Sequence, residues 1–200
     1  MSKTSDTLII IPAYNEEESI AGVLRGLLDL ELDADILVVN DGSVDRTQEI
    51  VSQFPVFIVS HPNNLGYGAS LQSGYRFAAK RGYRFVAQYD ADGQHDSKDL
   101  INVLKELKKG EADVVIGSRF LGNPDFHPGW MKIVAIVFFR GLIRLFTGKK
   151  VLDPTSGLRG LGRRAFAYYS GRKTFPSDFP DADIIIDMLL KKFTVIEIPI

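Results

Sequence analysis

The sequence contains no cysteine. Disulfide bonds and thiolate metal sites are therefore excluded, and the absence fits a reducing cytoplasm. An excess of either charge is also missing, because 24 Lys and Arg residues face 25 Asp and Glu residues, for a net charge of -1. This balance argues against a protein that coats nucleic acid, and we expect no nucleic-acid partner.

Long hydrophobic runs are absent as well. The most apolar stretch covers residues 131–139 and ends at Arg140, whereas a helix needs about 20 apolar residues to cross a bilayer. Residues 1–6 are polar and lack the basic-then-apolar order of a signal peptide. We therefore expect a cytoplasmic protein, either soluble or peripheral at the inner face of the membrane.

Short apolar segments alternate with segments whose apolar residues recur at helical spacing. We expect strands at 7–11, 36–39, 56–59, 84–88, 114–116 and 194–200, and helices at 16–30, 45–53, 68–80, 97–108, 131–146, 163–169 and 184–192. This alternation predicts an α/β fold with a Rossmann-like, mostly parallel central sheet and helices on both faces. Because the last strand runs to Ile200, we expect residues 1–200 to form a single domain that is truncated at its C-terminal end.

In such sheets, ligands bind beyond the carboxyl ends of the strands. The loops that follow the first five expected strands are polar, rich in glycine or acidic: PAYNEE (12–17), NDGSVD (40–45), HPNNLGYG (61–68), DADGQHD (90–96) and GSRF (117–120). We therefore expect the functional site along this edge of the sheet.

Asp90 and Asp92 stand one residue apart, directly after the apolar residues 85–87. Asp and Gly are common in turns, so a turn is one explanation of this stretch. A shared divalent cation is the other, because magnesium and manganese take oxygen ligands and would cancel the repulsion between the two carboxylates. The position of the pair at the ligand edge favours the metal.

Asp41 ends the second expected strand, where its carboxylate can accept hydrogen bonds from a base or a ribose. Gly42 permits a tight turn, and Ser43 or Asp45 can cap the next helix. A turn and a cap explain part of this stretch, but not the acid at the strand tip.

Gly66, Gly68 and Asp90 imitate the spacing of a dinucleotide-binding fingerprint, which would indicate an NAD-dependent dehydrogenase. The third glycine position is Leu71, however, and the motif follows the third strand rather than the first. The sequence also lacks a P-loop and a G-x-S-x-G element, so neither a P-loop nucleotidase nor a Ser-His-Asp hydrolase is indicated.

Six stretches in order resemble the family 2 glycosyltransferases of the GT-A fold: IPAYNEEESI, VVNDGSVDRT, NNLGYGASLQSGYRFA, DADGQHD, VVIGSRF and DPTSGLRG. The last of them is similar to the polyprenyl-phosphate (dolichol-phosphate mannose synthase-like) branch. The resemblance implies an inverting hexosyltransferase that uses Mg²⁺ or Mn²⁺ and a UDP- or GDP-linked sugar. It favours an undecaprenyl or dolichyl phosphate as the acceptor.

The resemblance also implies roles for individual residues. It places Pro12, Tyr14 and Glu16 in the nucleotide pocket, Val39 and Asp41 at the base and ribose, Asp90, Asp92 and Gln94 at the metal with Ala91 beside them, Arg119 at the phosphates, and Asp153 with Thr155, Ser156 and Gly157 on the acceptor side. The expected catalytic residues are therefore Asp92, Arg119 and Asp153.

The acceptor decides whether a base is needed. A lipid phosphate is already ionised, whereas the hydroxyl of a glycan needs a carboxylate to take its proton. Asp153 is the first candidate for that base, and Asp181 and Asp183 are weaker ones. Transfer to a glycan hydroxyl in cell-surface polysaccharide synthesis, the dehydrogenase and a non-catalytic nucleotide-binding module stay open as alternatives.

The expected helix at 131–146 carries Lys132, Arg140 and Arg144 within one sector of an otherwise apolar surface. This basic edge fits either an ordinary surface helix or a helix that contacts a membrane surface.

Overall fold

The computed structural model describes residues 3–93, 97–122, 130–173, 175–177 and 182–200. Within these ranges one sheet runs in the order β3-β2-β1-β4-β6-β5-β7. Its strands are β1 (Thr7–Ala13), β2 (Asp35–Asn40), β3 (Phe57–Ser60), β4 (Phe85–Gln88), β5 (Val114–Ser118), β6 (Arg159–Gly162) and β7 (Val195–Pro199). All pairings are parallel except those of β6, which runs antiparallel to both neighbours. The expected mostly parallel sheet is confirmed.

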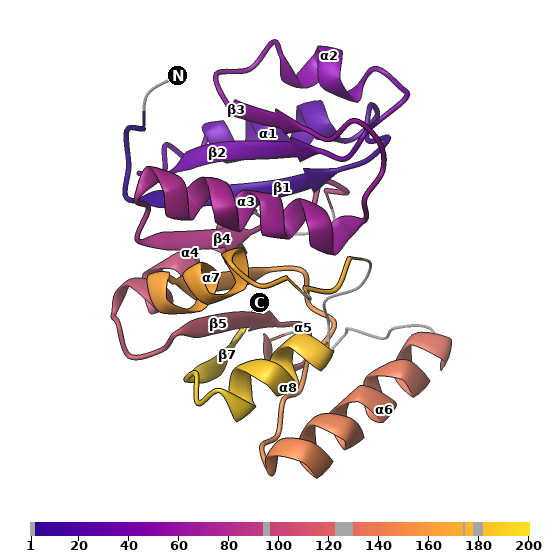
Figure 1. Cartoon of the computed structure of the whole chain (residues 1–200), viewed down its shortest axis with the longest axis vertical. Helices are drawn as coiled ribbons and strands as arrows, with labels where there is room; N and C mark the ends of the chain where they lie inside the picture. The colour runs from indigo at the N-terminus through magenta and orange to yellow at the C-terminus, as the bar shows by residue number, and fades with distance from the viewer. Residues whose placement is uncertain (1–2, 94–96, 123–129, 174, 178–181) are drawn as a thin grey trace.

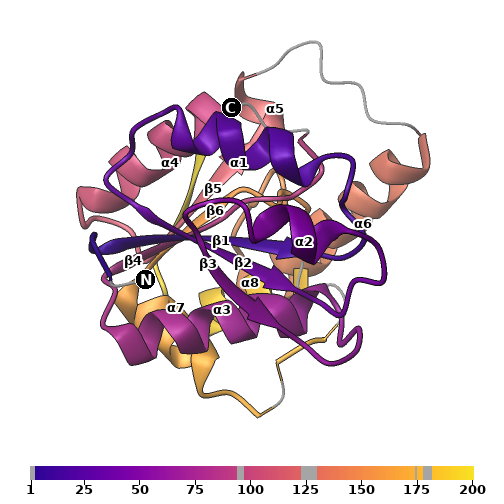
Figure 2. The same cartoon turned by 90° about the horizontal axis from the view of Figure 1, so that it is seen from above.

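Helices cover both faces of the sheet, as expected (Figure 1, Figure 2). They are α1 (Ile20–Leu28), α2 (Thr47–Val51), α3 (Tyr67–Arg81), α4 (Ser97–Lys108), α5 (Arg119–Gly122), α6 (Trp130–Thr147), α7 (Arg163–Ser170) and α8 (Ala182–Leu190). In Figure 2, α1 and α4 lie on one side of the sheet, and α3, α7 and α8 lie on the other. The sheet therefore separates two hydrophobic cores.

The central strand β1 shows why the sequence folds in this way. Each of its residues is buried, and the side chains alternate between the two cores. Leu8 and Ile10 join Tyr75 of α3 in one core, whereas Ile9 and Ile11 join Leu24 of α1 in the other. A parallel strand covered on both faces needs such a continuous apolar run. Its carboxyl end is then fixed at the ligand edge of the sheet.

Two short elements differ from the expectation. Strand β6 lies in a stretch for which no strand was expected, and α5 begins in the expected loop GSRF. The sequence of β6, RGLG, has neither apolar alternation nor β-branched residues. Pairing on both sides makes it a strand, because β6 fills the space between β4 and β5. A Cβ on Gly160 would lie 2.9 Å from Val103, so α4 packs closely over this strand.

Helix α6 lies at the side of the molecule, beside α8 (Figure 1). Ile136 and Ile143 face inward and are buried, whereas Val134, Val137 and Phe138 on the opposite face are exposed. Among the helices of the described residues, none combines the length and the apolar character needed to cross a bilayer. The side chain of Lys132 lies outside the described part of the chain.

Candidate active site

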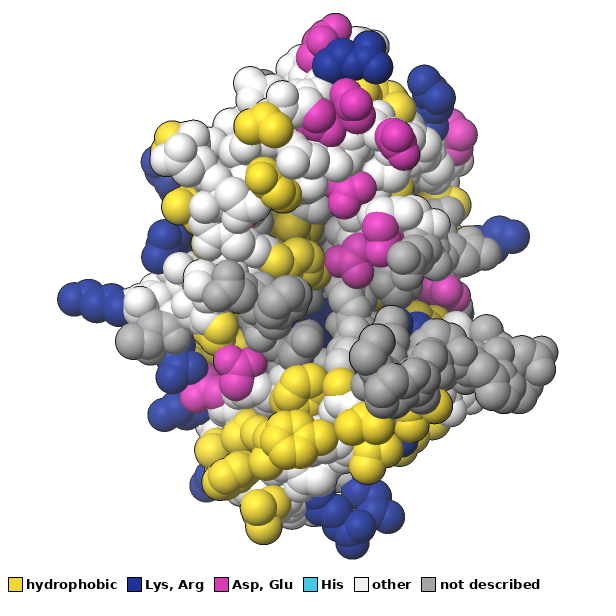
Figure 3. Space-filling model, turned by 90° about the vertical axis from the view of Figure 1, so that its right-hand side faces the viewer, with side chains coloured by type: hydrophobic (Ala, Val, Ile, Leu, Met, Phe, Trp, Pro, Cys, Tyr) yellow, Lys and Arg dark blue, Asp and Glu magenta, His cyan; other side chains and the backbone are white. Residues whose placement is uncertain are grey.

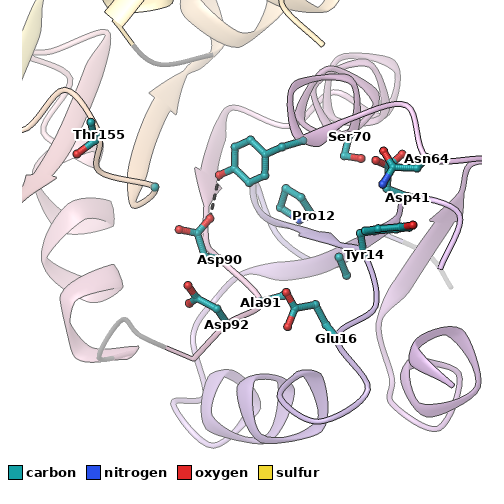
Figure 4. Close-up of a pocket in the computed structure, with 13 residues that line it drawn as sticks. Pro12, Tyr14, Glu16, Asp41, Asn64, Ser70, Asp90, Ala91, Asp92 and Thr155 are labelled. Carbon is teal, nitrogen blue, oxygen red and sulfur yellow. Dashed lines mark hydrogen bonds between the residues drawn. The ribbon is translucent and has the colours of Figure 1, made fainter. Parts of the chain in front are cut away.

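A cavity of about 440 Å³ opens at the carboxyl ends of β1, β2 and β4. It brings together most of the residues expected from the sequence: Pro12, Tyr14, Glu16, Asp41, Asp90, Ala91 and Asp92, with Thr155 and Gly157. In Figure 4, Asp90 and Asp92 lie on one side, Asp41 lies on the other, and Pro12 and Tyr14 lie between them. The ligand edge of the sheet is thus where the concave site lies.

Other expected residues lie elsewhere. Val39 is fully buried in a core and does not line the cavity. Arg119, Asp153 and Ser156 do not line it either, and Asp153 and Ser156 are buried. Asp183 is exposed in the first turn of α8. The predictions for Gln94 and Asp181 fall outside the described residues.

The first acid of the pair is held in place by Tyr67. The Tyr67 hydroxyl donates to Asp90 Oδ1 at 2.9 Å (Figure 4). Burial, followed by the charge of Asp90 and this hydrogen bond, raises the pKa of Tyr67 well above its ordinary value. The hydroxyl therefore stays protonated at neutral pH and keeps donating, which fixes the orientation of the Asp90 carboxylate. Sequence reasoning missed Tyr67, since its contact with Asp90 depends on how α3 packs beside β4.

The residues of this edge fit a magnesium or manganese ion. Asp92 is exposed at the cavity, two positions after Asp90 in the chain. No cluster of three Asp, Glu, His or Cys side chains that could hold a metal is found in the part of the chain that the structure covers. Magnesium is commonly held by only one or two carboxylates, together with water and the phosphates of a substrate. A pair of acids therefore suits a cation that arrives with a phosphate ligand.

Gly157 lies against the other oxygen of the same carboxylate. A Cβ on Gly157 would lie 1.9 Å from Asp90 Oδ2, far inside van der Waals contact. The turn that precedes β6 can approach Asp90 only because residue 157 is glycine. This close approach to Asp90 explains why the first glycine of the DPTSGLRG stretch, Gly157, is needed.

Replacing Gly157 by Ala is expected to weaken manganese binding about 10- to 100-fold, the range for residues that orient metal ligands. The new methyl group would displace the Asp90 carboxylate from its position and so disturb its hydrogen bond with Tyr67. The fold should persist, because the clash is with a side chain that can rotate. Titration with Mn²⁺ measures the effect. Gly171→Ala is the matched control, since a Cβ there meets nothing within 4 Å. Equal manganese affinity in both variants would contradict this geometry.

Asp41 is buried and accepts several hydrogen bonds. Its Oδ1 lies 2.6 Å from His61 Nδ1 and accepts the Leu65 N–H at 3.0 Å, and its Oδ2 accepts the Gly66 N–H at 2.8 Å. His61 Nε2 lies 2.8 Å from Ser73 Oγ. His61 therefore orients the acid at the tip of β2. This role of His61 could not be predicted from the sequence, because His61 and Asp41 meet only across β2 and β3.

The turn after β2 confirms the expected need for Gly42. Its φ is 72°, a conformation that favours glycine. A Cβ there would also lie 2.5 Å from the backbone of Asn63. The polar loops after β2 and β3 therefore pack directly against each other at the cavity.

Arg119 and Asp153 form a buried pair. Nε and Nη2 of Arg119 donate to Oδ2 and Oδ1 of Asp153, both at 2.8 Å, and the Arg119 N–H adds a bond at 3.1 Å. Burial alone would raise the pKa of Asp153, but hydrogen bonds and the charge of Arg119 outweigh it and hold this pKa below its ordinary value. Arg119 Nη2 also donates to Thr155 Oγ1 at 3.1 Å, and Thr155 lines the cavity. Arg119 is thereby linked to the site through one residue.

Several known proteins resemble this chain, among them two relatives and one solved structure. The UDP-N-acetylglucosamine–dolichyl-phosphate N-acetylglucosaminyltransferase of Methanococcus voltae is 28% identical over 210 residues, which cover 96% of this chain and 83% of the relative. The dolichol-phosphate mannosyltransferase of Pyrococcus furiosus is 30% identical over 202 residues, again 96% of this chain but only 54% of the relative. This chain thus spans about half the length of the second relative.

The solved structure is glucosyl-3-phosphoglycerate synthase of Mycobacterium tuberculosis in complex with Mn²⁺ and UDP-glucose. It superposes with a TM-score of 0.71 at 20% identity, covering 97% of this chain and 69% of that one. This likeness confirms the expected GT-A fold. The model of the family described as "Glycosyl transferase family 2" matches residues 8–169, and the chain therefore belongs to that family.

Proposed function

We propose that the protein transfers a sugar from a UDP- or GDP-linked donor to a polyprenyl phosphate. The observation that carries this proposal is the Asp90 and Asp92 pair, which shares one cavity with the buried Asp41. A nucleotide diphosphate has a base and ribose at one end and charged phosphates at the other. The cavity has the Asp41 carboxylate at one side and the carboxylates of Asp90 and Asp92, which would hold a cation, at the other (Figure 4).

Four of the residues that line the cavity would then have defined roles. Asp90 and Asp92 would hold Mg²⁺ or Mn²⁺, which supplies positive charge to neutralise the departing diphosphate. Asp41, oriented by His61, would accept hydrogen bonds from the base or ribose. Tyr14 is 45% exposed and lines the cavity, so its ring would offer an aromatic face to the nucleotide.

The class of acceptor is inferred from the positions of the acidic residues that were candidate bases. Both carboxylate oxygens of Asp153 accept hydrogen bonds from Arg119, and the lowered pKa of Asp153 makes it a weak base. Asp183 does not line the cavity. A glycan hydroxyl would need a base, whereas an ionised phosphate does not. Of the candidate bases within the described residues, neither is suited to take a proton at the cavity, which favours a phosphate acceptor. Asp153 instead holds Arg119 against Thr155 in the cavity wall.

Helix α6 fits an acceptor that carries a lipid. Its outward face exposes Val134, Val137, Phe138 and Leu145. Figure 3 shows a band of hydrophobic side chains in the lower part of the molecule, where α6 lies, with Lys and Arg side chains below it. An apolar face with a basic edge suits contact with a membrane surface better than exposure to water.

The dehydrogenase alternative is disfavoured by the packing around Gly68. The Gly68 N–H donates to Ser177 O at 2.7 Å, and a Cβ there would lie 2.0 Å from Pro176 O. The backbone of Gly68, the second glycine of the apparent fingerprint, is thus covered by Pro176 and Ser177. A dinucleotide needs that backbone open to receive its pyrophosphate.

Calorimetric titration of the protein with UDP- and GDP-sugars, with and without Mn²⁺, tests the proposal. We expect one nucleotide class to bind only with the metal, and its sugar to appear on an added polyprenyl phosphate. NAD binding without metal would instead indicate the dehydrogenase. Metal-dependent binding without turnover on any acceptor would indicate a nucleotide-binding module, and turnover on a glycan alone would overturn the lipid acceptor.

A further inference from the structure

Another cavity, of about 240 Å³, lies beside the C-terminal half of α6. It is lined by Arg140, Gly141, Arg144, Lys150, Val151 and Leu152. Three of these six residues carry a cationic side chain, and none of the described lining residues carries a carboxylate. None of the six lines the acidic cavity at the sheet edge. The two cavities are therefore separate and suit ligands of opposite character.

Arg140 forms a fixed wall of this basic cavity. Its Nε donates to Leu152 O at 2.7 Å, and its guanidinium carbon lies 4.4 Å from the centre of the Phe120 ring. Its Nη2 is buried and has no hydrogen-bond partner in the part of the chain that the structure describes. Buried donors are normally paired, so Arg140 keeps one unused donor in the wall beside the cavity.

Arg144 and Lys150 are exposed, and neither forms an ion pair with another described residue. Glu197 reaches the same loop, but its oxygens accept the N–H groups of Leu152 and Asp153. Arg144 also lies in the last turn of α6, where a cation offsets the helix dipole. The dipole explains one cation at the helix end, but not three around a cavity.

The basic cavity lies next to the exposed apolar face of α6. Val137, Gly141 and Arg144 follow one another at i, i+4 and i+7, so they share one stripe of the helix. Val137 and Phe138 are 58% and 60% exposed, and Leu145 is 76% exposed. A ligand that satisfies both features has a charged phosphate and an adjoining apolar part.

We propose that the basic cavity binds the phosphate headgroup of an anionic membrane lipid while the apolar face of α6 enters the bilayer surface. The site is distinct from that of the acceptor phosphate, which must reach the donor in the acidic cavity. The inference rests on the membrane contact of the proposed function, and it does not depend on the transfer chemistry. It would hold α6, and with it the neighbouring α8, at the membrane surface.

Sedimentation of the full chain with lipid vesicles tests the proposal. We expect stronger binding to phosphatidylcholine vesicles that contain phosphatidylserine than to phosphatidylcholine alone. Each cation near an anionic surface contributes about fivefold, so the double variant Arg144→Gln, Lys150→Gln should bind the anionic vesicles roughly 25-fold more weakly. Val137→Asp should weaken binding to both kinds of vesicle. Lys105→Gln, at an exposed lysine of α4, is the matched control and should bind as the wild type does.

Binding of the double variant equal to that of wild type would overturn the proposal. So would an equal loss in the Lys105→Gln control, because net charge alone would then be responsible. If inorganic phosphate binds the cavity in calorimetry and vesicles do not bind at all, the ligand is a free phosphate rather than a lipid. Metal-dependent nucleotide binding is measured in parallel without vesicles. Its failure would overturn the proposed sugar transfer but would not affect the proposed lipid site.

Discussion

Replacing Asp92 by Asn is expected to reduce sugar transfer roughly a thousandfold or more, which corresponds to about 4 kcal/mol of transition-state stabilisation. The substitution keeps the size of the side chain but removes one of the two negative charges that would hold the proposed cation. A divalent ion contributes several kcal/mol to such reactions by stabilising charge on the leaving group. Because Asp92 is exposed, its loss should barely change the free energy of unfolding.

Turnover and manganese-dependent nucleotide binding measure this effect, and thermal melting checks the fold. Asp33→Asn provides the control, because Asp33 is another exposed acid that does not line the cavity. An Asp92→Asn enzyme with wild-type turnover would refute metal binding by the pair. Lost turnover together with unchanged manganese affinity would assign Asp92 a different task.

Replacing Asp153 by Asn should lower the free energy of unfolding at pH 7 by about 3–5 kcal/mol, the usual cost of removing one partner of a buried ion pair. Asp153 is fully buried and Arg119 is 18% exposed at its side chain, so water can replace little of the lost interaction. The amide nitrogen of Asn would also face the donors of Arg119. We expect sugar transfer to fall as well, since Arg119 loses the partner that orients it.

The effect should depend on pH in one direction. The pKa of Asp153 is lower in the folded protein than its ordinary value. Its ionised form therefore stabilises the fold fully above the unfolded-state pKa of about 3.9, and the contribution disappears as the pH falls through the lower folded-state pKa. Urea unfolding should show the whole difference between wild type and variant at pH 7, and a shrinking difference below about pH 4. Asp183→Asn, at an exposed position, serves as the control. A difference that does not shrink in acid would contradict the ionic origin of the stabilisation.

The sequence predicts well those features that depend on local patterns. The apolar runs of β1, β2 and β5 and the polar loops after them were enough to predict the sheet and its ligand edge. The cavity at that edge indeed contains Asp41, Asp90 and Asp92. These residues follow buried strands directly, so the register of each strand places the acid.

Features that depend on distant contacts could not be predicted. Strand β6 exists because β4 and β5 pair with it, and its own residues carry no strand signal. His61 looked like an isolated loop histidine until β2 and β3 placed it 2.6 Å from Asp41. Asp153 looked like a candidate base until its side chain was found paired with Arg119. In each case the partner lies 20 or more positions away in the chain.

The reversed direction of β6 has a consequence for redesign. Because β6 runs against β4, its beginning rather than its end meets the acid pair, and the preceding turn presses Gly157 onto Asp90. The two halves of the site therefore cannot be exchanged as independent modules. A chimaera that imports this turn from another enzyme would have to import a glycine at the same place, or it would disturb the opposite half of the site without altering a single residue there.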